Sequence, residues 1–138
     1  MPTFRVVFMD NSGKTILLAE DNMLNQRLME VSLRRFGFPV VVANNGVEAV
    51  NLYEANPESF CLIIMDIMMP VMDGCEATEK IRSFEQNRNY RVPIIALTAN
   101  TLNNDRDRCL ALGMDDYLAK PLNLELLNQA FRRLGIII

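Results

Sequence analysis

Polar side chains that could do chemistry stand at the ends of apolar runs in this 138-residue chain. Glu20 and Asp21 follow the run TILLA, Asp66 ends CLIIMD, Thr98 ends IIALT, and Lys120 follows YLA. Such short runs, bounded by turn residues, are typical of strands buried on both faces of a parallel sheet. An unpaired carboxylate is costly to bury, so Asp66 is expected where its strand ends and the loop opens. Because ligands bind at the carboxyl ends of parallel strands, we expect these side chains to converge there.

These residue types predict a metal site beside an anion site. The carboxylates of Glu20, Asp21 and Asp66 would repel one another unless a hard cation lay between them, and Mg²⁺ binds through a few carboxylate oxygens. The Thr98 hydroxyl and the compact positive charge of Lys120 suit a phosphoryl group. Asp66 would then lie between metal and anion, in the position of a nucleophile.

Each of these residues also has an ordinary structural interpretation. Taken alone, Asp66 would be interpreted as a turn or helix-capping residue. Thr98 would be interpreted as a hydrogen-bonding residue at a strand end, and Lys120 as a solvated charge. Glu20 and Asp21 would be favoured before a helix by its dipole. Their coincidence at one predicted sheet edge favours the functional interpretation.

Apolar periodicity alternates between the strand and helix patterns along the chain. Strands are predicted at residues 15–19, 40–43, 61–65, 94–98 and 117–119, and helices at residues 22–36, 46–56, 74–84, 103–112 and 123–134. Helical crossovers impose right-handed parallel connections, which predicts an α/β fold with a doubly wound sheet in three layers. The strand order does not follow from alternation alone.

The predicted first helix carries two adjacent apolar rows. Leu24, Leu28 and Val31 form one row, and Met29, Leu33 and Phe36 form the other. Both rows have the spacing of an amphipathic helix.

Composition excludes several classes of protein. One domain fits this length, with half of the residues hydrophobic. A net charge of −3 predicts no direct nucleic-acid binding, and no apolar run of about 18 residues is present that would span a membrane. Arg5, Asp10 and Lys14 interrupt what would be the core of a secretory signal.

The cysteines indicate a reducing compartment. Cys61, Cys75 and Cys109 lie far apart with no CxxC pair, which favours a cytoplasmic location. Cys75, expected in the loop beyond Asp66, is the candidate for an exposed thiol.

Four motifs together resemble the receiver domain of two-component response regulators. They are EDN at residues 20–22, LIIMDIMMPVMDG at 62–74, IIALTA at 94–99 and DDYLAKP at 115–121. The resemblance implies a flavodoxin-like fold with strand order 2-1-3-4-5. It covers residues 15–134, leaving an N-terminal extension of unknown role at 1–14 and a short tail at 135–138. With Asn22 and Asn25 after the acidic pair, the sequence resembles receivers fused to hybrid histidine kinases, which implies the cytoplasmic part of a larger membrane-associated kinase as the alternative location.

The resemblance also implies what the acidic residues do. Asp66 would accept a phosphoryl group from a phosphohistidine. Glu20 and Asp21 would hold Mg²⁺, or Mn²⁺ in its place, together with Asp66 and the backbone carbonyl of Met68.

The remaining implied roles concern the phosphoryl group and the switch. Thr98 and Lys120 would contact phosphoryl oxygens, and Tyr117 would turn inward on activation. The implied partners are a histidine kinase or histidine phosphotransfer protein and a downstream target that binds the predicted fourth helix, fifth strand and fifth helix. The chain has no histidine, so it would be an acceptor without substrate turnover of its own.

Competing functions meet specific obstacles. A haloacid-dehalogenase-type phosphatase needs a second Asp two residues after the nucleophile, where Met68 stands. A flavin carrier needs a Ser/Thr/Gly-rich phosphate loop after the first strand, and EDN is acidic. SGKT at residues 12–15 resembles the end of a nucleotide-binding P-loop, but Phe8 replaces the leading glycine and the segment precedes a strand. A pseudo-receiver that works without phosphorylation stays open.

The bond between Lys120 and Pro121 is expected to be cis. The peptide lies at a strand end beside the predicted site, where tertiary contacts readily offset the small cis penalty of an X-Pro bond.

Overall fold

The structure is a computed structural model that describes residues 14–99 and 105–136. The predicted extension at residues 1–14 lies outside the described residues except for Lys14, as do the first two residues of the helix predicted at 103–112.

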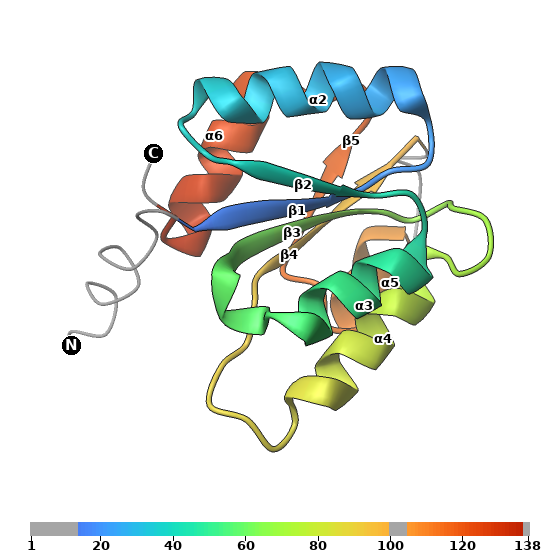
Figure 1. Cartoon of the computed structure of the whole chain (residues 1–138). Coiled ribbons are helices and arrows are strands. Elements are labelled where there is room, and N and C mark those ends of the chain that lie inside the picture. Colours follow the sequence, from blue (N-terminus) through green and yellow to red (C-terminus); the bar gives the residue numbers. More distant parts are fainter. Residues whose placement is uncertain (1–13, 100–104, 137–138) are drawn as a thin grey trace.

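Five parallel strands form the sheet at the centre of the molecule (Figure 1). They are β1 (Thr15–Ala19), β2 (Val40–Ala43), β3 (Phe60–Asp66), β4 (Ile94–Thr98) and β5 (Asp116–Ala119). Their order is β2-β1-β3-β4-β5, which confirms the flavodoxin-like order. β3 is longer at both ends than the predicted strand, and all seven of its residues are buried.

Helices cover both faces of the sheet. α2 (Met23–Arg35) and α6 (Leu124–Leu134) lie on one face, and α3 (Gly46–Ala55), α4 (Gly74–Glu85) and α5 (Asp105–Ala111) lie on the other (Figure 1). Alternate residues of each strand feed two cores, with Leu17 and Ile63 under α3 and α4, and Ile16 and Leu62 under α2 and α6. The three-layer prediction is confirmed. A short 3-10 turn, η1 (Pro57–Ser59), was not predicted; it forms where Pro57 follows the end of α3.

Only one of the two apolar rows on α2 faces the sheet. Met29 and Leu33 are buried, whereas Leu24, Leu28 and Val31 are 66%, 59% and 56% exposed. The periodicity identified both rows, but it could not say which way the helix is turned.

Two glycines bring the β3–α4 loop close to its neighbours. A Cβ on Gly74 would collide with the Asp66 carbonyl oxygen, and a Cβ on Gly46 would lie 2.5 Å from the Met72 carbonyl oxygen. The Gly74 N–H donates to the Ile67 carbonyl and the Gly46 N–H to the Met72 carbonyl, both at 2.9 Å. The backbone after Asp66 is thereby held from two sides.

The expectation that Cys75 lies in a loop is wrong. It is buried, at 8% exposure, as the second residue of α4, because that helix begins directly after its cap Asp73. No helix among the described residues is long and apolar enough to cross a membrane.

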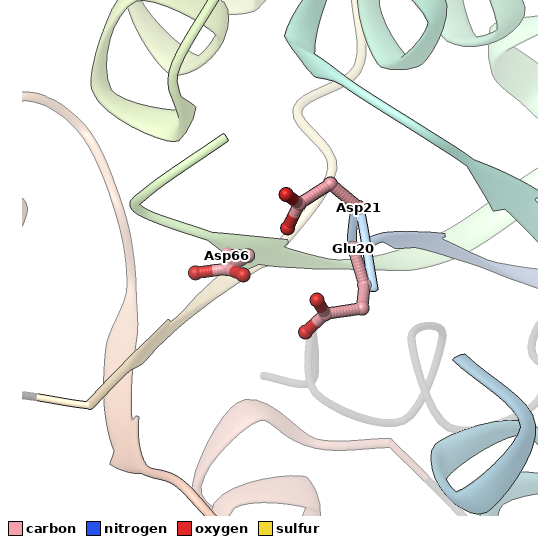
Figure 2. Close-up of side chains that lie close together, drawn as sticks. All are labelled: Glu20, Asp21 and Asp66. Atoms are coloured by element: carbon pink, nitrogen blue, oxygen red, sulfur yellow. The ribbon is translucent and has the colours of Figure 1, made fainter. Parts of the chain in front are cut away.

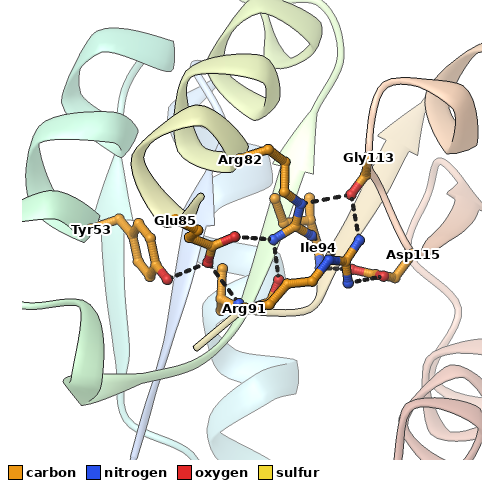
Figure 3. Close-up of polar contacts among 8 residues, drawn as sticks. Tyr53, Arg82, Glu85, Arg91, Ile94, Gly113 and Asp115 are labelled. Atoms are coloured by element: carbon orange, nitrogen blue, oxygen red, sulfur yellow. Dashed lines mark hydrogen bonds and ion pairs between the residues drawn. The ribbon is translucent and has the colours of Figure 1, made fainter. Parts of the chain in front are cut away.

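A polar network that sequence reasoning missed joins α4 to the segments before β4 and β5 (Figure 3). Glu85, with 4% of its side chain exposed, pairs with Arg82 at 2.7 Å and accepts a hydrogen bond from the Tyr53 hydroxyl at 2.5 Å. Burial and this hydrogen bond raise the pKa of Tyr53. Arg82 also pairs with Asp115 at 2.9 Å and donates to the Gly113 carbonyl at 2.8 Å.

Candidate functional site

Three carboxylates meet at the carboxyl edge of the sheet. Glu20, Asp21 and Asp66 each bring an oxygen within 4.8 Å of the others, and Figure 2 shows the side chains turned toward the same space. β1 and β3 are neighbours with Ala19 opposite Met65, so Glu20, which follows β1, lies beside Asp66, the last residue of β3. Glu20 and Asp66 are buried, at 0% and 2% exposure, and Asp21 is exposed. The predicted acidic cluster is confirmed.

The turn from β1 into α2 fixes Glu20. Its backbone N–H donates to the Ala43 carbonyl at 3.0 Å, and its Oε2 accepts the Asn22 N–H at 3.0 Å. Asn22 then caps α2, since its side-chain oxygen accepts the Asn25 N–H at 2.9 Å. The two asparagines after the acidic pair therefore serve the helix start.

Lys120 is the cation of this cluster. Its Nζ lies 2.6 Å from Asp66 Oδ2 and 3.1 Å from Glu20 Oε1. Burial lowers the pKa of Lys120, but the hydrogen bond and negative charge of Asp66 and the charge of Glu20 outweigh it, so the pKa is raised. The ammonium thus stays charged at neutral pH. The Lys120–Pro121 bond is cis, which confirms that prediction.

The carboxylate of Asp66 is held through both of its oxygens. Oδ1 accepts the Met68 N–H at 3.1 Å and Oδ2 accepts the Lys120 ammonium at 2.6 Å. Met68 contributes its backbone N–H to this site, and the residue is otherwise 75% exposed.

Thr98 and Tyr117 lie on the neighbouring strands. Thr98 ends β4 and is 3% exposed, and its carbonyl accepts the Lys120 N–H at 2.8 Å. Tyr117 of β5 is half-buried and packs against the core on the α3 and α4 side. Glu20, Asp66, Thr98 and Lys120 therefore lie at the ends of β1, β3, β4 and β5, whereas Tyr117 lies within β5.

The donor set fits a divalent cation. Glu20 Oε1 is buried, and it pairs at 3.1 Å with the Lys120 ammonium, which also pairs with Asp66. A buried carboxylate oxygen next to two more carboxylates matches the oxygen ligands that Mg²⁺ prefers.

Comparison with known proteins identifies the family. Residues 16–132 match the response regulator receiver domain family. This chain is a receiver domain of that family. It is 41% identical over 117 residues to hybrid signal transduction histidine kinase I of Dictyostelium discoideum, covering 83% of this chain. It is 35% identical over 148 residues to histidine kinase 5 of Arabidopsis thaliana, covering 90% of this chain. The chain spans 7% and 16% of these two relatives.

Solved receiver domains share the architecture. The receiver domain of sensor histidine kinase PA1611 from Pseudomonas aeruginosa, with Mg²⁺ coordinated in its active-site cleft, is 45% identical with a TM-score of 0.78, covering 90% of this chain and 98% of that one. The receiver domain of Ssk1 from Saccharomyces cerevisiae, crystallised with the histidine phosphotransfer protein Ypd1, is 35% identical with a TM-score of 0.81, covering 88% of each chain.

Millimolar Mg²⁺ should raise the melting temperature of this receiver domain. Saturation to about ten times Kd stabilises the folded state by about 1.4 kcal/mol, which is a shift of a few degrees. Asp21→Ala removes one carboxylate from the cluster and should lose most of the shift, whereas Glu58→Ala, an exposed carboxylate in η1, should keep it. Thermal unfolding with and without Mg²⁺ measures this. An unchanged shift in Asp21→Ala would remove Asp21 from the metal site.

Proposed function

We propose that this receiver domain takes a phosphoryl group from a phosphohistidine onto Asp66 and changes conformation to relay a signal. One observation carries the proposal: Asp66, 2% exposed, belongs to the carboxylate cluster and also pairs with Lys120 at 2.6 Å. No other described carboxylate combines the cluster with this close a contact to a cation.

The transfer exchanges one bond to phosphorus for another. An Asp66 carboxylate oxygen forms the new P–O bond while the P–N bond to the donor histidine breaks, and the imidazole leaves with that electron pair. Charge accumulates on the phosphoryl oxygens in the transition state. Lys120, released from Asp66 Oδ2, and the Thr98 hydroxyl supply a positive charge and a hydrogen bond to those oxygens. Water later cleaves the acyl phosphate, returning the carboxylate and inorganic phosphate.

The metal ligands would be Glu20, Asp21, Asp66 and the backbone carbonyl of Met68, holding Mg²⁺ or Mn²⁺ in its place. Bound there, the ion supplies positive charge that offsets the charge of the phosphoryl oxygens. The clustering of the Glu20, Asp21 and Asp66 carboxylates, with Glu20 and Asp66 buried, supports this assignment.

The proposed switch uses Thr98 and Tyr117. A phosphoryl group that draws in the Thr98 hydroxyl leaves space for the Tyr117 ring, and the surface of α5, β5 and α6 changes with it. Arg133 of α6 pairs with Asp116 of β5 at 2.7 Å, which supports treating β5 and α6 as one surface for a downstream target.

The proposed setting is a cytoplasmic phosphorelay. The donor would be a histidine kinase or a histidine phosphotransfer protein, and this domain, at residues 15–134, would be an acceptor and not a turnover enzyme. The kinship with receiver domains of hybrid histidine kinases and the absence of histidine from the 138 residues support this.

Intact-protein mass spectrometry tests the proposal. Acetyl phosphate with Mg²⁺ should add one phosphoryl group to the wild-type chain, and the gain should be lost in base and kept in acid, as expected of an acyl phosphate. No gain from acetyl phosphate or from a phosphohistidine donor would overturn the proposal and leave the pseudo-receiver standing.

A further inference from the structure

Gln26 of α2 joins the turn that carries two of the clustered carboxylates to the neighbouring β2–α3 turn. Its Nε2 donates to the Glu20 carbonyl at 2.5 Å and to Asn44 Oδ1 at 2.8 Å. Glu20 follows β1, and Asn44 follows β2. These strands are neighbours with Ala19 opposite Ala43, so the two turns leave the sheet side by side. One side-chain amide therefore bridges the two turns.

Glu48 of α3 fixes the direction of this bridge. Its Oε1 accepts the Asn44 backbone N–H at 2.9 Å and the Asn44 Nδ2 at 3.0 Å. Because the side-chain nitrogen of Asn44 donates to a carboxylate, its side-chain oxygen is left to accept from Gln26. A hydrogen bond to a charged acceptor is stronger than a neutral one, so Asn44 presents that oxygen in a defined position.

The same segment, residues 44–46, also contacts the loop that follows Asp66. The Gly46 N–H donates to the Met72 carbonyl at 2.9 Å. The three clustered carboxylates come from the β1–α2 turn and from the end of β3. Residues 44–46 supply none of the three, but they are bonded to the first of these segments through Gln26 and to the continuation of the second through Gly46.

The Gln26 side chain does not serve its own helix. A polar residue near a helix start commonly caps it, and here Asn22 does so through the Asn25 N–H. α2 begins at Met23, so both acceptors of the Gln26 amide lie outside the helix. Its hydrogen bonds therefore hold the turn that carries the acidic pair.

We propose that Gln26 is a positioning residue for the metal site, acting on the Glu20 carbonyl and braced by Asn44. This proposal rests on the proposed function, in which Glu20 and Asp21 bind Mg²⁺. The carbonyl that Gln26 holds belongs to the peptide between these two ligands, so it sets their relative placement. Mg²⁺ demands near-ideal octahedral geometry. Hydrogen-bond partners behind metal ligands typically change metal affinity by about 10–100-fold when they are removed.

Gln26→Met separates positioning from stability. Methionine has nearly the same length and helix propensity as glutamine, but it has no N–H to donate. Without Mg²⁺ the melting temperature should stay within about 5 °C of wild type, because only the bonds of one half-buried amide are lost. The dissociation constant for Mg²⁺, measured by thermal unfolding over a series of Mg²⁺ concentrations, should rise about tenfold.

The rate of labelling by acetyl phosphate gives a second readout. At an Mg²⁺ concentration equal to the wild-type dissociation constant, about half of the wild-type sites and about one in eleven of the Gln26→Met sites would be filled. Labelling of the variant should then be about fivefold slower. At saturating Mg²⁺ the two rates should agree within about twofold, because excess Mg²⁺ makes up for the weaker affinity.

Asn44→Ala tests the brace. It should weaken Mg²⁺ binding as Gln26→Met does, and the double variant should lose little more than either single variant, because both changes remove one bridge. Asn51→Met is the matched control, since it places the same side chain at an exposed polar position of α3. It should leave the dissociation constant unchanged.

Several results would overturn the proposal. They are a dissociation constant in Gln26→Met within about twofold of wild type, an equal rise in Asn51→Met, full additivity in the double variant, and slow labelling that saturating Mg²⁺ does not restore. A Gln26→Met chain that is unfolded without Mg²⁺ would also overturn it, because Gln26 would then be needed for folding itself. Wild-type protein that binds Mg²⁺ but is not labelled would instead count against the proposed function alone.

Discussion

Asp66→Asn should carry no phosphoryl group after treatment with acetyl phosphate and Mg²⁺. Asparagine keeps the size of the side chain, and its oxygen can still accept the Met68 N–H, but the amide is not a carboxylate nucleophile. We expect labelling to fall by more than about 10³-fold, as reaction rates do when enzymes lose a nucleophile. Intact-protein mass spectrometry measures the loss.

The fold should survive this change. Removing one of three clustered carboxylates relieves their repulsion, and Lys120 still has Glu20 at 3.1 Å. A melting temperature at or above that of wild type would show that lost labelling is chemical. The same mass gain in Asp66→Asn as in wild type would assign the acceptor to another residue.

Lys120→Ala is the informative contrast, because it keeps the nucleophile and removes the cation. Losing one charge-stabilising group typically slows a reaction by about 10²–10³-fold, so slow labelling should remain.

In wild type, the pKa of the Lys120 ammonium is raised above its ordinary value of 10.5. Its stabilising contribution is therefore complete below that pH and is lost only as pH rises through the higher folded-state pKa.

The carboxyl edge of the sheet could be predicted because the sequence indicates where each strand ends. Each run of buried strand residues stops at a polar residue, and parallel strands place those stops at one edge. Glu20, Asp66, Thr98 and Lys120 all lie where this logic puts them. The strand order was taken from family resemblance, because alternation of strands and helices is compatible with several orders.

The properties that escaped prediction depend on contacts between distant segments. Helical spacing does not determine which row of α2 faces the sheet, so the exposure of Leu24 and Leu28 could not be predicted. Val71 has a φ of 69°, and because a valine disfavours positive φ, no local rule anticipates this conformation. The close pairing of Lys120 with Asp66 joins residues 54 positions apart.

The Arg82 network shows the same limit most clearly. Glu85 follows Ala77 and Ile81 at helical spacing on the buried face of α4. An acidic residue at such a position indicates that a buried partner pairs with it. Arg82, three residues away, is visible in sequence. The partners Tyr53 and Asp115 are not, because they are 32 and 33 residues distant from Glu85 and Arg82.

Arg82→Ala should destabilise the domain by about 3–5 kcal/mol, because it leaves Glu85 as a buried charge without its cation. Glu85 would keep hydrogen bonds from Tyr53 and Val92, but two neutral donors replace little of a charge that is 4% exposed. The carbonyls of Gly113 and Val92 would each lose an Arg82 hydrogen bond of 2.8 Å. Denaturant unfolding measures the loss as a lower midpoint with an unchanged slope.

Arg91→Ala distinguishes the effect of burying the Arg82 charge from the effect of its contacts with Asp115 and Gly113. Arg91 pairs with Asp115 at 2.6 Å and donates to the Gly113 carbonyl at 3.1 Å, so it shares both partners with Arg82. Its side chain is 53% exposed, compared with 15% for Arg82, so solvent screens the pair and its loss should cost less than about 1 kcal/mol. Similar losses in the two variants would mean that Asp115 and Gly113 account for the effect. A much larger loss in Arg82→Ala would place the energy in the buried pair with Glu85, the carboxylate that accepts the Val92 N–H just before β4.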